Sequence, residues 1–198
     1  IDLQLAPSAL SSRLKMELDL LFENEPWEKA INNLKDWGAL KILDPKLQFE
    51  DKFQERIESA KELNIEPLTA FIYGAQDPVG LSERLQLSQE QKRIITGGIK
   101  LRNHLKDIYL SKEYKDWTAS KWTAFLEHKN SHKHSLALEI CINNPFKKYL
   151  LNWLNNWSKL DSPIKGDDLL AKGWEPGPEI GIEINRQRMK LIDKLSNI

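Results

Sequence analysis

An all-α fold is predicted by the spacing of the apolar residues along this 198-residue chain. Apolar residues recur three and four positions apart almost throughout, and the strict alternation typical of half-buried strands is nearly missing. Prolines stand where helices would begin and glycines where they would end. We therefore expect a multi-helix chain of about ten helices with no sheet.

Breaks in this spacing divide the first half of the chain into short helices. The first ends near Asn24, Pro26 opens the second, and Gly38 ends it. Asp44-Pro45 marks a further break. Helices are then expected over 50–63, 67–73 and 79–85.

A longer helix is predicted from Ser88 to about Tyr109. Ser88 and Gln91 are spaced as in a capping box, in which each side chain satisfies a free backbone N–H of the other residue. Gly97-Gly98 should weaken the middle of this helix, since each glycine costs about 1 kcal/mol relative to alanine. We interpret the pair as a kink or a close helix contact; a backbone opening toward a phosphate is the alternative. Later helices are expected over 117–129, 135–143 and 145–157.

The last part of the chain predicts a helix, a tight turn and a helix. Gly173 stands where a helix would end in the left-handed region, and Pro176-Gly177 forms a turn. Pro178 is placed to open the final helix, whose apolar pattern runs to Leu195.

Composition predicts a globular chain in a reducing compartment. Hydrophobic residues make up 40 % and charged residues 29 %, which excludes global disorder. A single cysteine, Cys141, precludes an internal disulfide. Neither a signal pattern nor an apolar run of about 18 residues is present, so we expect a cytoplasmic protein without a membrane partner.

The charge is segregated although its formal sum is zero. Residues 1–91 hold 10 Lys and Arg against 17 Asp and Glu, whereas residues 92–133 hold 10 against 4. A basic segment of this kind is typical of contact with a phosphate backbone. Most cationic helix faces are only solvated, so charge alone leaves both interpretations open.

Two further groups of residues could carry chemistry. The residue types of a metal site occur together in His128, His132, His134 and Cys141, but the predicted break at Asn130-Ser131 argues against a fixed site, so we expect no metal. Cys141 is expected to be a small buried hydrophobe.

Most of the seven tryptophans occupy helical core positions: Trp27, Trp37, Trp117, Trp122, Trp153 and Trp157. Trp174, in the tail turn, is the candidate for exposure, although docking between the two tail helices is the role that we expect.

The turn belongs to a longer linear motif. Its positions are Lys165, Gly166, Asp168, Leu169, Leu170, Gly173, Pro176, Gly177, Pro178 and Gly181. This motif resembles the C-terminal tail of bacterial class II tRNA nucleotidyltransferases, the CCA-adding enzymes and their poly(A) polymerase relatives. Residues 13–18, 26–31 and 34–40 are similar to the segment that follows the neck of that family. The resemblance implies the end of the neck in 1–24, a helical RNA-binding body in 25–112 and a helical tail in 113–198.

Catalysis in that family is phosphoryl transfer, which needs carboxylates that hold two metal ions. The family carries them in an N-terminal head, in a Gly-Ser and Asp-x-Asp pattern that does not occur in this chain. The nucleotide-selecting Glu-Asp-x-x-Arg run is also absent, and the chain begins at Ile1. The resemblance therefore implies a C-terminal fragment without catalytic residues, whose full-length form uses Mg²⁺ with CTP and ATP to add CCA, CC or A.

The resemblance also implies that tRNA is the partner, held through its backbone and shape so that its 3′ end reaches the head. The cations expected to contact it are Lys92, Arg93, Lys100, Arg102, Lys165, Lys172, Arg186 and Arg188. Two alternatives are a helical protein-interaction module that uses the acidic first half, and a scaffold without RNA binding. Only RNA binding should weaken steeply with salt.

Overall fold

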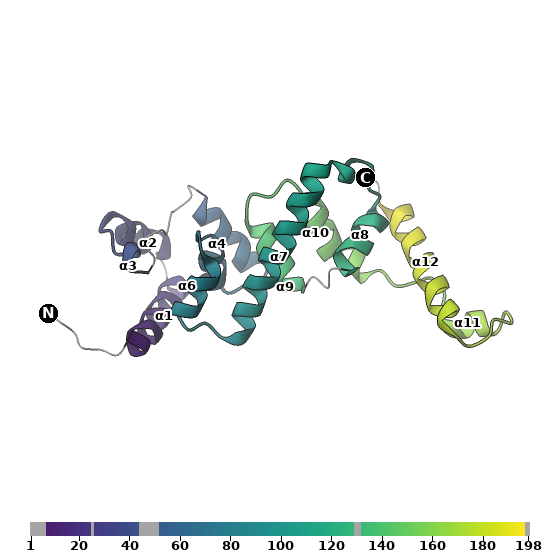
Figure 1. Cartoon of the computed structure of the whole chain (residues 1–198), viewed down its shortest axis with the longest axis horizontal. Coiled ribbons are helices and arrows are strands. Elements are labelled where there is room, and N and C mark those ends of the chain that lie inside the picture. Colours follow the sequence, from purple (N-terminus) through teal and green to yellow (C-terminus); the bar gives the residue numbers. More distant parts are fainter. Residues whose placement is uncertain (1–6, 25, 44–51, 129–131, 197–198) are drawn as a thin grey trace. The chain divides into compact units, whose positions relative to one another are not determined.

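The computed structural model describes residues 7–24, 26–43, 52–128 and 132–196 (Figure 1). These ranges contain twelve α-helices and two short 3₁₀ helices, and they contain no strand, which confirms the predicted all-α class. The helices are α1 (Pro7–Glu23), α2 (Trp27–Asp36), α3 (Leu40–Leu43), α4 (Phe53–Glu62), α5 (Pro67–Tyr73), α6 (Pro78–Arg84), α7 (Gln89–Ser111), η1 (Glu113–Asp116), α8 (Ala119–His128), α9 (Lys133–Cys141), α10 (Lys147–Asn155), η2 (Trp157–Lys159), α11 (Gly166–Leu170) and α12 (Pro178–Leu195). The breaks predicted at Asp44-Pro45 and Asn130-Ser131 lie outside the described residues.

The chain forms two compact units. Unit 1 comprises residues 1–102 and 132–144, and unit 2 comprises residues 103–131 and 145–198, so α7 contributes to both. The limits of neck, body and tail inferred from the resemblance follow the chain contiguously and stay a prediction. No helix within the described ranges is long and apolar enough to cross a bilayer.

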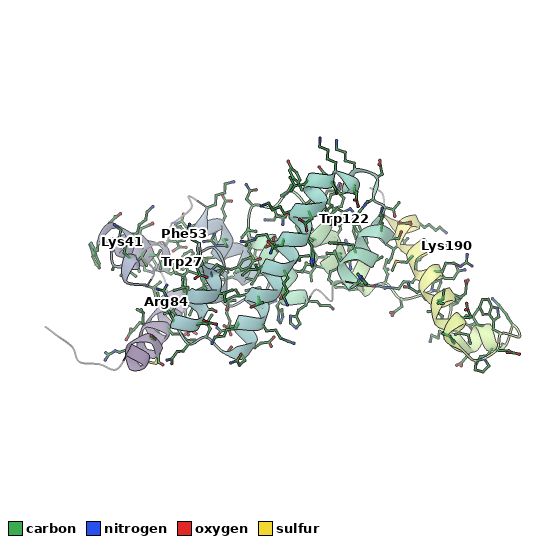
Figure 2. The ribbon with its side chains drawn as sticks, viewed as in Figure 1. Trp27, Lys41, Phe53, Arg84, Trp122 and Lys190 are labelled. Atoms are coloured by element: carbon green, nitrogen blue, oxygen red, sulfur yellow. The ribbon has the colours of Figure 1, made fainter. Side chains whose placement is uncertain are left out.

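The core of unit 1 is built around α5. Every residue from Leu68 to Tyr73 is buried, because α1, α4, α6 and α9 all pack against this short helix. A helix that is apolar all round belongs in an interior. Aromatic rings continue the core, with Trp27 and Phe53 meeting edge to face at 6.2 Å between ring centroids (Figure 2). Cys141 is buried at the end of α9, as predicted.

Several predicted helix ends are found as expected. The capping box before α7 is formed, with the Ser88 N–H donating to Gln91 Oε1 at 2.8 Å and the Gln91 N–H donating to Ser88 Oγ at 3.2 Å. Pro67 and Pro178 occupy the first turns of α5 and α12, where a missing N–H costs nothing. Local sequence therefore determines these boundaries.

The glycine pair of α7 lies at a close helix contact. The helix continues through Gly97 and Gly98 from Gln89 to Ser111. A Cβ at Gly98 would lie 2.7 Å from the Tyr73 hydroxyl, and a Cβ at Gly97 would overlap the Ser135 hydroxyl. The two glycines thus let α7 approach α5 and α9, which confirms the close-contact interpretation over the phosphate-binding one.

The core of unit 2 is an aromatic cluster around Trp122, which is fully buried in α8. Its ring stacks on Tyr149 at 4.7 Å and meets Trp117 edge to face at 4.9 Å. Ile192 brings the last turns of α12 onto α8 and is also fully buried.

One tryptophan departs from the predicted core pattern. Trp37 is 75 % exposed, so its assignment to the core is wrong. It is the C-cap residue of α2, six residues beyond the buried Ile31 and about 240° further round the helix. The apolar spacing therefore continues to Trp37, which lies beyond the end of α2 and off its buried face.

Candidate nucleic-acid interface

The tail of unit 2 is a helix, an exposed turn and a helix. Lys165 caps α11, and its N–H donates to the Asp168 carboxylate at 2.8 Å. Gly173 has a φ of +86°, and its N–H donates to the Leu170 carbonyl at 2.9 Å. A left-handed residue at this point closes a helix, and glycine adopts it without a Cβ penalty. The helix, turn and helix predicted from the sequence are therefore confirmed.

The turn presents its side chains outward. All residues from 171 to 179 are exposed, Lys172 and Trp174 among them. A Cβ on Gly166 would lie 3.8 Å from Ile180 Cγ2, so the start of α11 packs directly on the start of α12. Trp174 is 40 % exposed, so part of its ring is accessible, and an accessible aromatic ring can stack on an unpaired base.

The cations of the tail differ in how far they are already neutralised. Within the ranges that the structure describes, Lys165 and Lys172 have no ion-pair partner. Arg186 is exposed but held by Glu183, with Nε and Nη2 donating to the two carboxylate oxygens at 2.6 and 2.7 Å. These hydrogen bonds from Arg186, and to a smaller extent a hydrogen bond from Gln187, lower the pKa of Glu183 to about 2. The carboxylate is therefore charged at neutral pH, and it competes with any phosphate for Arg186.

Arg188 serves mainly inside unit 2. It is half-buried, and its two terminal nitrogens donate to Glu127 at 3.0 and 2.8 Å while Nε donates to the Leu160 carbonyl at 2.7 Å. The hydrogen bonds to Glu127 raise the pKa of Arg188 further. These bonds fasten α12 to α8, and a contact between Arg188 and RNA stays a prediction.

We expect Arg188→Met to lower the free energy of unfolding by about 1.5–3 kcal/mol, the usual loss for hydrogen bonds to a charged group. Arg186→Met is the matched control on the same helix. Its ion pair is exposed to solvent, so this variant should lose much less stability than Arg188→Met. Urea denaturation of the two variants tests this assignment, and equal losses would show that Arg188 does not fasten the helices.

The cations of α7 in unit 1 form a second group. Lys92 is half-buried, whereas Arg93 and Lys100 are exposed and, seven residues apart, lie on one face of the helix. Lys92 and Lys100 have no ion-pair partner in the described part of the chain. Arg93 pairs with Glu90 at 2.9 Å. The structure thus brings Arg93 and Lys100 together on one surface.

The Arg102 side chain contacts residues inside unit 1 and is only partly exposed to solvent. Its guanidinium lies 4.3 Å from the Tyr73 ring centroid, and its Nε donates to Glu139 at 2.9 Å. Glu139 is fully buried, and it also accepts hydrogen bonds from the Tyr73 hydroxyl and, at 2.8 Å, from the Asn144 amide. Burial, and then the charge of Glu139, raise the pKa of Tyr73, so its hydroxyl stays a neutral donor.

The sequence alone does not identify Glu139 as the partner of Arg102. The available signal was a lone carboxylate inside the continuous buried run from Ser135 to Cys141 of α9. A charge in such a position needs a counter-ion and hydrogen bonds, because an isolated buried carboxylate is costly. An RNA contact by Arg102 stays a prediction.

Among the solved structures that share this fold are two complexes of a CCA-adding enzyme. The complex with CTP aligns over 92 % of this chain at 19 % identity with a TM-score of 0.57. The complex with ATP aligns over 93 % at 20 % identity with a TM-score of 0.58. The chain spans about half the length of these proteins, 46 % and 47 % respectively. No family model and no curated protein matches the sequence.

Proposed function

We propose that this chain is the tRNA-binding part of a bacterial class II tRNA nucleotidyltransferase. Its role is to position the tRNA 3′ end for the addition of CCA, CC or A by a catalytic head that these residues do not include. The observation that supports this most is an agreement between two sources. The linear motif of the tail resembles these enzymes, and the chain shares its fold with CCA-adding enzymes over more than nine-tenths of its length.

The exposed cations suit a partner recognised by shape. Duplex RNA has a deep and narrow major groove that side chains cannot read, so proteins bind it largely through backbone phosphates and 2′-hydroxyls. Such contacts set register and orientation without reading the sequence. Lys165 and Lys172 are exposed and have no ion-pair partner among the described residues, and Trp174 of the same tail is 40 % exposed. Mg²⁺, CTP and ATP would act in the head, where the catalytic carboxylates of such an enzyme lie.

The test is the affinity for tRNA of the wild-type chain and of Lys165→Ala/Lys172→Ala. We expect weaker binding in this double variant, to a similar extent for tRNAs of different sequence, because phosphate contacts carry no base information. Lys29→Ala/Lys35→Ala is the matched control, since both lysines are exposed on α2 within the acidic first half. If both double variants lose the same tRNA affinity, the tail lysines are not part of the interface.

A second prediction uses the ion pair of the tail. Glu183→Gln should strengthen tRNA binding at neutral pH, because it removes a negative charge and releases Arg186 for a phosphate. The gain should disappear in Glu183→Gln/Arg186→Ala. Since the pKa of Glu183 is lowered from 4.5 to about 2, the pair is intact above about pH 4.5 and is lost only as the pH falls toward 2. Fluorescence anisotropy at pH 7 measures the effect, and weaker binding by Glu183→Gln would contradict it.

The rival function is a protein-interaction module on the acidic first half. Residues 1–91 carry a net charge of −7, which repels RNA and suits a basic protein surface. A chain that binds no tRNA even at low salt, with its fold intact, would favour this module over the RNA-binding role.

A further inference from the structure

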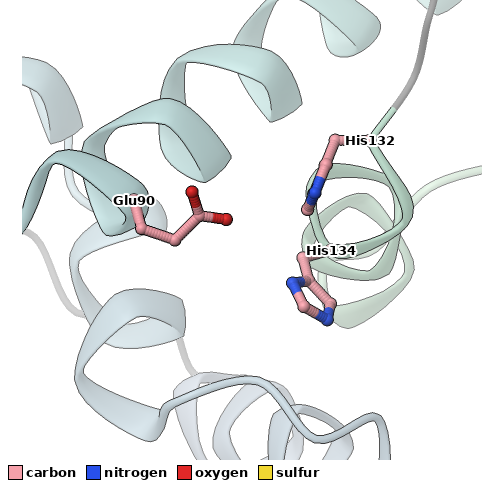
Figure 3. Close-up of side chains that lie close together, drawn as sticks. All are labelled: Glu90, His132 and His134. Atoms are coloured by element: carbon pink, nitrogen blue, oxygen red, sulfur yellow. The ribbon is translucent and has the colours of Figure 1, made fainter.

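Three side chains of the types that bind metal ions meet on unit 1 (Figure 3). Glu90 comes from the first turn of α7, His132 is the N-cap residue of α9, and His134 follows in its first turn. Their ligating atoms all lie within 4.8 Å of one another. The sequence alone groups His132 and His134 with His128 and Cys141 and predicts no metal. Cys141 is buried at the far end of α9, seven residues beyond His134.

The donor set has the chemistry of a zinc site. Two imidazoles and a carboxylate, with the fourth position open to water, are ligands that Zn²⁺ and similar borderline ions prefer. Ligand bonds of about 2.0–2.2 Å place tetrahedral donor atoms roughly 3.4 Å apart. The three groups must therefore approach one another by up to about 1.4 Å. Glu90 and His134 are exposed and His132 is half-buried, so side-chain rotation can supply this movement.

A cation already lies between two of the three ligands. Arg93 Nη2 is 2.9 Å from the Glu90 carboxylate and 3.2 Å from His132 Nε2. Both partners of this ion pair are more than half exposed, so the pair is weak and the guanidinium can turn into solvent. The Nδ1 atom of His132 is buried and has no hydrogen-bond partner among the described residues, so no competing bond from that atom holds the ring. Arg93 thus marks the cation position and competes for it.

We propose that Glu90, His132 and His134 bind a Zn²⁺-type divalent ion, which fastens the start of α9 to the start of α7. Arg93 leaves the site when the ion enters. An ion that binds the folded chain and not the unfolded one stabilises unit 1 by mass action. This site is separate from the tail cations that carry the proposed tRNA contact, so each proposal can fail without the other.

The experiment uses the full chain, free of any polyhistidine tag and stripped of metal with a chelator. Zn²⁺ is titrated by calorimetry, and Co²⁺ is titrated by visible absorption, which distinguishes tetrahedral from octahedral coordination. We expect one ion per chain and the absorption of a four-coordinate site. Glu90→Gln, His132→Ala and His134→Ala should each weaken binding by at least about 10- to 100-fold, the loss found even for residues that only support ligands.

Two further variants sharpen the result. Arg93→Gln should bind Zn²⁺ more tightly than the wild type, because it removes the competing cation. His128→Ala, at an exposed histidine of unit 2, should bind as the wild type does. Circular dichroism verifies that each variant is folded. A chain that binds neither ion, or ligand variants that bind as tightly as the wild type, would overturn the proposal.

Discussion

Arg102→Met is expected to lower the free energy of unfolding by about 3–5 kcal/mol, the cost of leaving a buried charge without its partner. Glu139 is fully buried, and Arg102 contributes a positive charge that contacts its carboxylate at 2.9 Å. The Tyr73 hydroxyl and the Asn144 amide also donate to Glu139, but neither carries a charge. Methionine keeps much of the volume of the arginine stem, so the loss reports mainly the missing charge.

The second variant of this pair separates charge from packing. Arg102→Met/Glu139→Leu should recover most of the lost stability, because apolar residues of similar volume often replace a buried ion pair at little cost. Urea denaturation followed by circular dichroism measures both variants. If the double variant is as unstable as Arg102→Met or more so, the pair contributes through its geometry and not by compensating a buried charge.

Trp122→Ala is expected to cost about 3–5 kcal/mol, the range for removal of a buried aromatic side chain. Trp122 is fully buried in unit 2, where its ring contacts Trp117, Tyr149 and Phe146. Truncation removes this apolar surface and leaves a cavity that the surrounding large rings cannot fill without rearrangement.

Trp174→Ala is the matched control for this loss. The same substitution at an exposed residue of the tail turn should change stability by no more than about 0.5 kcal/mol. Denaturant midpoints compare the two variants, and near-ultraviolet circular dichroism reports the aromatic core. A Trp122→Ala variant as stable as Trp174→Ala would mean that the aromatic cluster is not the core of unit 2.

Much of the helical architecture could be predicted because it depends on neighbouring residues. The capping box of Ser88 and Gln91, the left-handed Gly173 and the helix start at Pro178 each involve residues within about one turn. The fold class follows from apolar spacing in the same way. Trp37 shows the limit of this reasoning, since the spacing cannot tell where the buried face stops.

The two clusters of charged and ligating side chains could not be predicted because their members are distant in sequence. Arg102 contacts Glu139, which lies 37 residues later in the sequence. Glu90 lies close to His132 and His134, which are more than forty residues later. Only the packing of α7 on α9 brings these groups together. Tertiary contacts also divide the predicted cations. Lys165 and Lys172 have no ion-pair partner in the described ranges, whereas Arg102 pairs with Glu139 and Arg188 with Glu127.

The salt dependence of tRNA binding tests the central claim most directly. Cations that neutralise phosphates release counterions, so the logarithm of the association constant should fall linearly with the logarithm of salt concentration. If Lys165 and Lys172 each contact a phosphate, the double alanine variant should show a slope shallower by about two. An affinity independent of salt, or the same slope in both chains, would contradict a tRNA-backbone interface on this tail.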